Sequence, residues 1–188
     1  MSKKLLLRIG VGVVVAGIAI VLGLIKDDPS CEQKSLLDGK VSMLYPTEGK
    51  EDTFIENSDP EIIYTSTTMS TKRWEIGAGV NDFSGSEALP IADLDDADRQ
   101  SLLQSFAKEF VKNANGKIVK TAPAKMPGAA AAISGAASIA KSKDGSEAEI
   151  HFKIGLKENR NAIFFVHYVK GKLSEEYRDK VLDSAEMK

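Results

Sequence analysis

The sequence predicts an α+β fold, in which amphipathic helices flank an antiparallel β-sheet, preceded by one N-terminal membrane-spanning helix. Three observations support it: an apolar run near the start, short stretches in which apolar and polar residues alternate along the rest of the chain, and two stretches whose apolar residues recur with helical periodicity. Nearly all connections between these stretches are short, which favours antiparallel pairing because parallel strands need long crossovers.

Residues 1–26 are expected to be a signal anchor. Residues 9–25 carry no charged or polar side chain, and they include Ile9, Val13, Ile20 and Leu24. With residues 5–8 the run matches a hydrocarbon core of about 30 Å. Basic residues precede the run and acidic residues follow it, so the N-terminus is expected in the cytoplasm and the rest outside the cell membrane.

Alternatives remain open at this end of the chain. The apolar run also resembles a signal peptide cleaved after residues 21–23, although such runs are normally 7–15 residues long. One helix face carries small residues that permit homodimer formation through the anchor, or that are simply common in membrane helices: Gly12, Ala16, Ala19 and Gly23. Cys31 is either a free thiol or a crosslink between two such chains.

Charge argues against one class of partner. The chain has 25 basic and 27 acidic residues. Four basic residues and no acidic residue lie within 1–26, which leaves 21 basic and 27 acidic residues, a net charge of −6, in residues 27–188. A mildly acidic domain is not expected to bind nucleic acid. One cysteine and two histidines also offer little for a disulfide framework or a cofactor, and we predict no cofactor.

The rest of the chain divides into a polar tether, residues 27–38, and an extracytoplasmic domain, residues 39–188. The first half of the domain has four predicted strands: residues 40–45, 53–56, 61–69 and 72–83. Residues 93–114 form the clearest helix, with an apolar stripe at three-to-four spacing. The acidic residues at its start are typical of helix capping, and they lack the Gly and Glu positions of a calcium loop.

The second half has strands at 117–121, 147–157 and 162–169, and a last helix at 175–187 capped by Ser174. The alanine-rich segment 129–140 is ambiguous, because alanine favours helix whereas its neighbours favour strand. For the last hairpin, the turn at 158–161 and a continuous apolar face predict that Ile150 lies opposite Tyr168. In that register His151 and His167 oppose each other.

The segment "KVSMLYP" resembles the opening strand of one known family, "NANGKIVK" its passage from helix to strand, and "MPG" and "YRDKVLDSAEMK" its later landmarks. Together with the order of elements, these segments resemble the PsbP-like α/β/α sandwich family. The resemblance covers residues 39–188. It implies assembly, scaffolding or small-ligand roles more than catalysis, and it implies no individual site residue.

Two groups of residues are candidates for function. His151 and His167 would lie close enough to share a metal ion, although a catalytic zinc site normally needs three protein ligands. The loop with Phe83, Leu89 and Ile91 is the candidate surface for a protein partner. No nucleophile elbow or other catalytic signature occurs, so an enzyme is not expected.

We therefore expect a membrane-anchored, extracytoplasmic, non-enzymatic interaction or assembly module whose protein partner is unidentified. The alternative is a module that binds a small ligand or a metal through the last β-hairpin.

Overall fold

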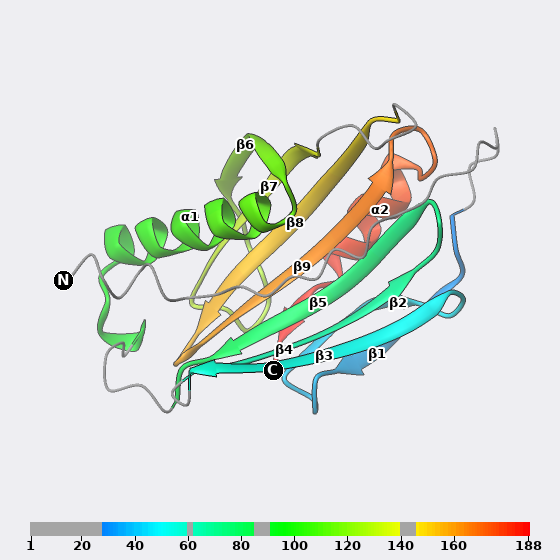
Figure 1. Ribbon diagram of the computed structural model, residues 1–188. Coiled ribbons are helices and arrows are strands. Elements are labelled where there is room, and N and C mark those ends of the chain that lie inside the picture. The colour runs from blue at the N-terminus through cyan, green and yellow to red at the C-terminus, as the bar shows by residue number, and fades with distance from the viewer. Residues whose placement is uncertain (1–27, 60–61, 85–90, 140–145) are drawn as a thin grey trace.

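The computed structural model describes residues 28–59, 62–84, 91–139 and 146–188, and these form an α+β fold of two antiparallel sheets and two α-helices (Figure 1). The elements are, in chain order, β1 Cys31–Leu36, β2 Val41–Pro46, β3 Lys50–Asp59, β4 Ile62–Ser70, β5 Trp74–Asp82, the short 3-10 helix η2 Ile91–Asp93, α1 Asp96–Asn113, β6 Gly116–Pro123, β7 Ala131–Ile139, β8 Ala148–Lys157, β9 Arg160–Val169, α2 Glu175–Asp183 and β10 Glu186–Met187.

The larger sheet has seven strands in the order β3-β4-β5-β9-β8-β7-β6, and the smaller sheet has the order β1-β2-β10. The expected antiparallel sheet with helices on its faces is confirmed, but the strands divide between two sheets and do not form one. The two halves of the large sheet, β3-β4-β5 and β9-β8-β7-β6, are joined by the pairing of β5 with β9, which lie side by side near its centre.

Two parts of the small sheet differ from the sequence expectation. Residues 31–36 of the expected tether form β1, which pairs along its whole length with β2. The last helix ends at Asp183, four residues before the predicted Met187, because β10 pairs with β2 instead. The Met187 side chain is buried there, so the extended backbone gains apolar burial that another helical turn would not provide.

The two faces of the large sheet carry separate cores. On one face, α1 packs over β6, β7 and β8, and its Phe106 and Phe110 lie among buried side chains such as Phe152. On the other face, α2 and the small sheet cover the half that contains β5 and β9, where Tyr45 and Phe164 are buried. The two covering layers are therefore offset from each other across the sheet (Figure 1).

The helix predicted for 93–114 is confirmed, and its N-terminus is capped as expected. The Asp95 carboxylate accepts a hydrogen bond from the backbone N–H of Asp98 at 2.8 Å. This satisfies one of the amides that have no partner inside the helix. The apolar stripe, which includes Leu103 and Phe110, faces the sheet.

The alanine-rich segment is a strand, β7, between β6 and β8. Its small side chains allow close packing on both faces. A Cβ at Gly135 would lie 2.3 Å from the Cζ atom of Phe152, so this position has no room for any side chain. Neighbouring strands therefore override the helix preference of alanine.

Two glycines with the same backbone conformation allow a test of how the chain end is held. Gly128 and Gly171 have φ of +77° and +79°, a region that costs an L-residue about 1–2 kcal/mol. A Cβ at Gly128 would lie 1.8 Å from the carbonyl oxygen of Met187, whereas a Cβ at Gly171 would meet nothing within 4 Å. We expect Gly128→Ala to lower the free energy of unfolding by at least about 1 kcal/mol more than Gly171→Ala, as overpacking does. Urea unfolding of the full chain in neutral detergent measures both, and equal losses would contradict the packing of β10 against residue 128.

Candidate functional site

The register predicted for the last hairpin is wrong by one residue, and the histidine pair does not form. Ile150 pairs with His167, and His151 pairs with Val166. Successive side chains of a strand point to opposite faces, so the two histidines lie on opposite sides of the sheet. His167 instead lies 3.7 Å from the carboxylate of Glu75, and both side chains are buried. Among the described residues, no three His, Cys, Asp or Glu side chains are grouped as a metal site.

The loop proposed as an interaction surface does not present its aromatic residue to solvent. Phe83 and Ile91 are 2% and 1% exposed and belong to the core under α1. Phe83 stacks on Phe106, with ring centroids 6.0 Å apart. Hydrophobic burial therefore explains these two positions, and Leu89 lies outside the described residues.

The anchor positions Ile9, Val13, Ile20 and Leu24 also lie outside the described residues. Within the part of the chain that the structure describes, no helix has the length and apolar character needed to cross a membrane.

A cleft of about 590 Å³ lies on the α2 side of the sheet, over the half that the small sheet leaves uncovered. Strands β6, β7 and β8 form its floor and α2 forms one wall. Its charged and imidazole side chains come from β6, the segment that follows it, β8 and α2: Lys120, Lys125, His151, Lys153, Arg178, Asp179 and Asp183.

A β-bulge in β6 places one of these lysines in the cleft. Ile118 pairs with Ala137, but the next pair is Lys120 with Ala136, so Val119 is an extra residue in the strand. Without the bulge, Val119 would lie opposite Ala136. The bulge thus reverses the alternation, so that Lys120 and not Val119 points to the cleft side. Val119 is 68% exposed.

Small side chains on β7 form the middle of the floor. Ala136 lies between Lys120 of β6 and His151 of β8, and Ser134 lies between Ala122 and Lys153. The low bulk of β7 keeps the floor below the charged side chains that surround it, which leaves room for a ligand between them.

Helix α2, which forms the wall of the cleft, is held in place by the packing of its buried face. The Ser174 hydroxyl caps it by accepting a hydrogen bond from the Tyr177 N–H at 3.0 Å, as the sequence predicts. Tyr177 and Val181 point into the core between α2 and the sheets. The next positions around the helix, Arg178 and Asp179, consequently line the cleft.

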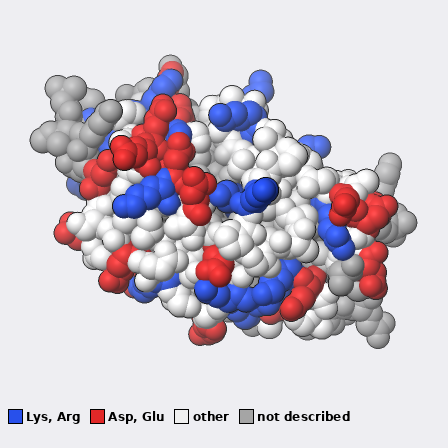
Figure 2. Space-filling view, turned by 180° about the vertical axis from the view of Figure 1, so that it is seen from behind, with Lys and Arg blue, Asp and Glu red and all other residues white. Residues whose placement is uncertain are grey.

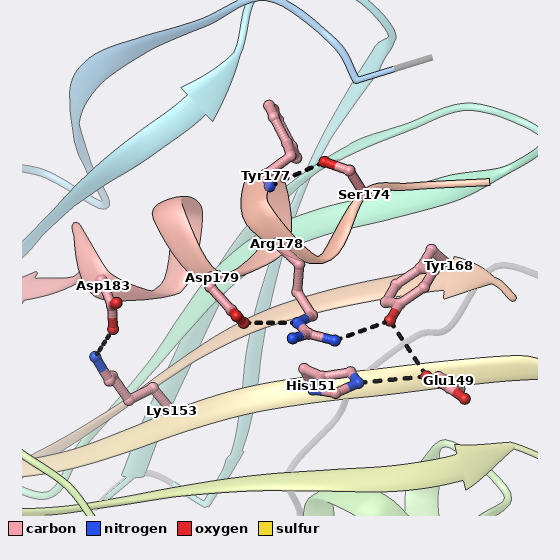
Figure 3. A network of polar contacts seen from close by, with 9 residues as sticks. All are labelled: Glu149, His151, Lys153, Tyr168, Ser174, Tyr177, Arg178, Asp179 and Asp183. Carbon is pink, nitrogen blue, oxygen red and sulfur yellow. Dashed lines mark hydrogen bonds and ion pairs between the residues drawn. The ribbon is translucent and has the colours of Figure 1, made fainter. Parts of the chain in front are cut away.

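A chain of polar contacts joins α2 to the floor (Figure 3). The Arg178 guanidinium donates to Asp179 at 2.7 Å and to the Tyr168 hydroxyl at 3.4 Å. Tyr168 donates in turn to the Glu149 carboxylate at 3.2 Å, and that carboxylate lies 3.4 Å from His151 Nε2. The His151 ring also stacks on Tyr168, with centroids 5.9 Å apart. These contacts hold Arg178 and His151 in fixed positions at the cleft.

A second contact joins α2 to the floor through Lys153. Its ammonium donates to the Asp183 carboxylate at 3.0 Å and to the Leu182 carbonyl at 3.2 Å. The Lys153 side chain is only 10% exposed, whereas Asp183 is 77% exposed. The pair therefore fixes the lysine at the edge of the cleft without removing it from the lining.

The cleft has more positive than negative charge. Four basic side chains line it against two carboxylates, and these carboxylates already pair with Arg178 and Lys153. Lys120 and Lys125 form no ion pair within 4 Å with the described residues, and both are exposed. On this side of the molecule, acidic side chains gather in one area at the upper left of Figure 2, and basic side chains lie across the middle and along the lower edge. An anion would neutralise the excess positive charge of the cleft.

Ionisation in the cleft follows from these contacts. The hydrogen bond from Arg178 holds the pKa of Asp179 below its usual range. The same contact raises the pKa of Arg178, so the guanidinium stays charged. Burial lowers the pKa of His151 below its ordinary 6.5, and the positive charge of Arg178 lowers it further, while Glu149 opposes both.

The sequence alone did not identify this site. Its residues come from three consecutive strands, the segment between β6 and β7, and the last helix, and Lys120, Lys125 and Arg178 belong to no motif. Of the predicted site residues that the structure describes, only His151 lies here. The small side chains of segment 129–140 were the one feature of the sequence that could have indicated the cleft. A strand of small residues leaves space over the sheet between the larger side chains of its two neighbouring strands.

Comparisons with known proteins do not identify the chain. No family model matches it, so the PsbP-like resemblance is not confirmed, and no curated protein matches it. Among solved structures it is similar to LpqN of Mycobacterium tuberculosis, a protein described as involved in cell envelope biogenesis. The TM-score is 0.40 and the sequences are 13% identical over 86% of each chain. A similarity this low assigns neither family nor function.

The position of His151 predicts how stability depends on pH. Because its pKa is lowered in the folded protein, the unfolded chain binds more protons once the pH falls below about 6.5. The free energy of unfolding should then decrease between pH 7.5 and 5.5, and it should decrease less in His151→Gln, which cannot be protonated. Urea unfolding of both proteins across this range checks the difference, and parallel curves would show that His151 is not held in its neutral form.

Proposed function

We propose that this protein is a non-enzymatic binding module that takes an anionic ligand in the cleft between α2 and strands β6–β8. One observation carries the proposal. The domain as a whole is acidic, yet the cleft gathers four basic side chains and pairs only two of them with lining carboxylates. Phosphate or carboxylate groups are the ligands that such an arrangement binds best, because charge-assisted hydrogen bonds to ammonium and guanidinium groups are strong.

The arrangement of the basic groups supports recognition of a ligand that spans the cleft. Lys120 projects from the β6 side of the floor, and Arg178 projects from α2 on the other side. Arg178 is held by Tyr168 and Asp179, so little side-chain freedom is lost when it binds a ligand. The small floor residues Ser134 and Ala136 leave the space between them open.

A binding role is favoured over a catalytic one by the contacts of His151. Among the described residues, its ring nitrogens hydrogen-bond to Glu149 and to no serine, threonine or cysteine. Thr121 lines the cleft, but its hydroxyl points to the opposite face of the sheet, where it bonds to Gln104 of α1. The site thus has basic groups for binding but no nucleophile joined to a base, which covalent catalysis requires.

We also propose that the domain is extracytoplasmic and held by a single-pass anchor with its N-terminus in the cytoplasm. The apolar run of residues 9–25 and its basic inner flank support this topology. A PsbP-like relationship for residues 39–188 belongs to the same proposal, and it rests on the sequence landmarks described above.

In the experiment, the full chain in neutral detergent is titrated with inorganic phosphate, and the heat of binding is measured by calorimetry. Replacing Lys120 and Lys125 together by glutamine should weaken binding at least about tenfold, since each charge-assisted contact contributes on the order of 1 kcal/mol or more. Both lysines are exposed, so the fold should be unaffected.

The matched control is the double variant Lys108→Gln, Lys112→Gln, which removes two exposed lysines from α1 on the opposite side of the sheet. It lowers the net charge by the same amount and should leave phosphate binding unchanged. Equal weakening in both variants would mean that only overall charge matters, and absence of binding by the unaltered chain to phosphate and to a tricarboxylate such as citrate would refute the proposed function.

A further inference from the structure

The start of α2 is attached to the segment that follows the predicted anchor. The Asp28 carboxylate accepts hydrogen bonds from the backbone N–H of Ser174 at 2.8 Å and from its hydroxyl at 2.5 Å. Ser174 is also the residue that caps α2. The helix that forms the cleft wall therefore begins where the chain leaves the apolar run.

With residues 9–25 as the proposed anchor, this attachment brings the cleft towards the membrane. Ile25, the last apolar residue of the run, is three residues before Asp28, so they are separated by at most about 10 Å of extended chain. Arg178 is four residues beyond Ser174, a rise of about 6 Å along the helix. With the Asp28 side chain and its 2.8 Å hydrogen bond to Ser174 included, the near end of the cleft lies within roughly 22 Å of the hydrocarbon boundary, and lipid headgroups occupy about the first 5–7 Å of that distance.

Charge directs an anionic lipid to the cleft and not to the domain surface in general. Residues 27–188 carry a net charge of −6, and the first turn of α2 exposes Glu175 and Glu176 on the same end of the molecule. These carboxylates oppose flat adsorption to an anionic membrane. A single headgroup that enters the cleft meets Arg178, Lys120 and Lys125 instead.

The lining of the cleft also suits a headgroup that remains joined to its lipid. Next to the basic side chains lie the apolar side chains of Ala122, Ala124 and Leu182. These can contact the glycerol and the first methylene groups, while the phosphate pairs with the basic groups.

On these grounds we propose that the ligand of the cleft is the phosphate headgroup of an anionic lipid from the membrane in which the chain's own anchor lies. This rests on the proposed anion-binding function and on the single-pass anchor. A free phosphate compound offers the same chemistry, so the test must separate the two sources.

The test compares the full chain in nanodiscs of phosphatidylcholine with nanodiscs that also contain phosphatidylglycerol. Lysine acylation followed by mass spectrometry reports the accessibility of each ammonium. We expect phosphatidylglycerol to slow labelling of Lys120 and Lys125 at least about threefold and to leave Lys108 on α1 unchanged. In Arg178→Gln the protection should decrease, because one of the phosphate contacts is removed.

A second variant separates membrane reach from anion binding. Asp28→Ala removes the attachment of the tether to α2 but alters no residue of the cleft. It should lose protection in phosphatidylglycerol nanodiscs and still bind inorganic phosphate in detergent as the unaltered chain does.

Each outcome has a distinct meaning. Protection of Lys120 and Lys125 by soluble glycerol phosphate, without any by phosphatidylglycerol in the disc, would overturn the lipid proposal and retain the anion-binding function. Equal protection of Lys108 would indicate nonspecific adsorption and overturn it as well. If neither soluble nor membrane phosphate protects the two lysines, the proposed function itself fails.

Discussion

The candidate site depends on the offset between the two layers that cover the seven-stranded sheet. Each face of a sheet must bury its apolar side chains against another layer. Here α1 covers the β6–β8 half on one side, and α2 with the small sheet covers the β5–β9 half on the other. Because neither layer extends over the whole sheet, the α2 side of β6–β8 is left open beside the helix. The cleft is thus a direct result of how the core is divided.

Local patterns predicted most of the elements, because burial on one face imposes a period that is visible in the chain. The stripe with Leu103 and Phe110, the alternation in β8 and the cap at Ser174 are all of this kind. The tether strand β1 could not be predicted in this way. Its six residues alternate poorly and are held by backbone pairing with β2, which depends on a partner in space.

The site was harder to predict because it depends on registers and not on patterns. A shift of one residue between β8 and β9 moved His151 and His167 to opposite faces, although both strands were correctly predicted. In the same way, Phe83 and Ile91 were predicted to lie in an exposed loop because the residues around them are typical of loops. Both are buried, because they pack against α1. His151 lies at the cleft together with Arg178 of α2. The sequence predicted this helix but not the partners of the Arg178 side chain.

The bulge in β6 has a consequence for how this protein can change over time. On the N-terminal side of Val119, Ile118 faces the α1 core, and on the C-terminal side Lys120 faces the cleft. The extra residue uncouples the two halves of one strand, so the floor of the cleft can accept new side chains while the positions that support α1 stay constant. Related chains could therefore differ in ligand by substitutions at a few floor positions, with the same core beneath them.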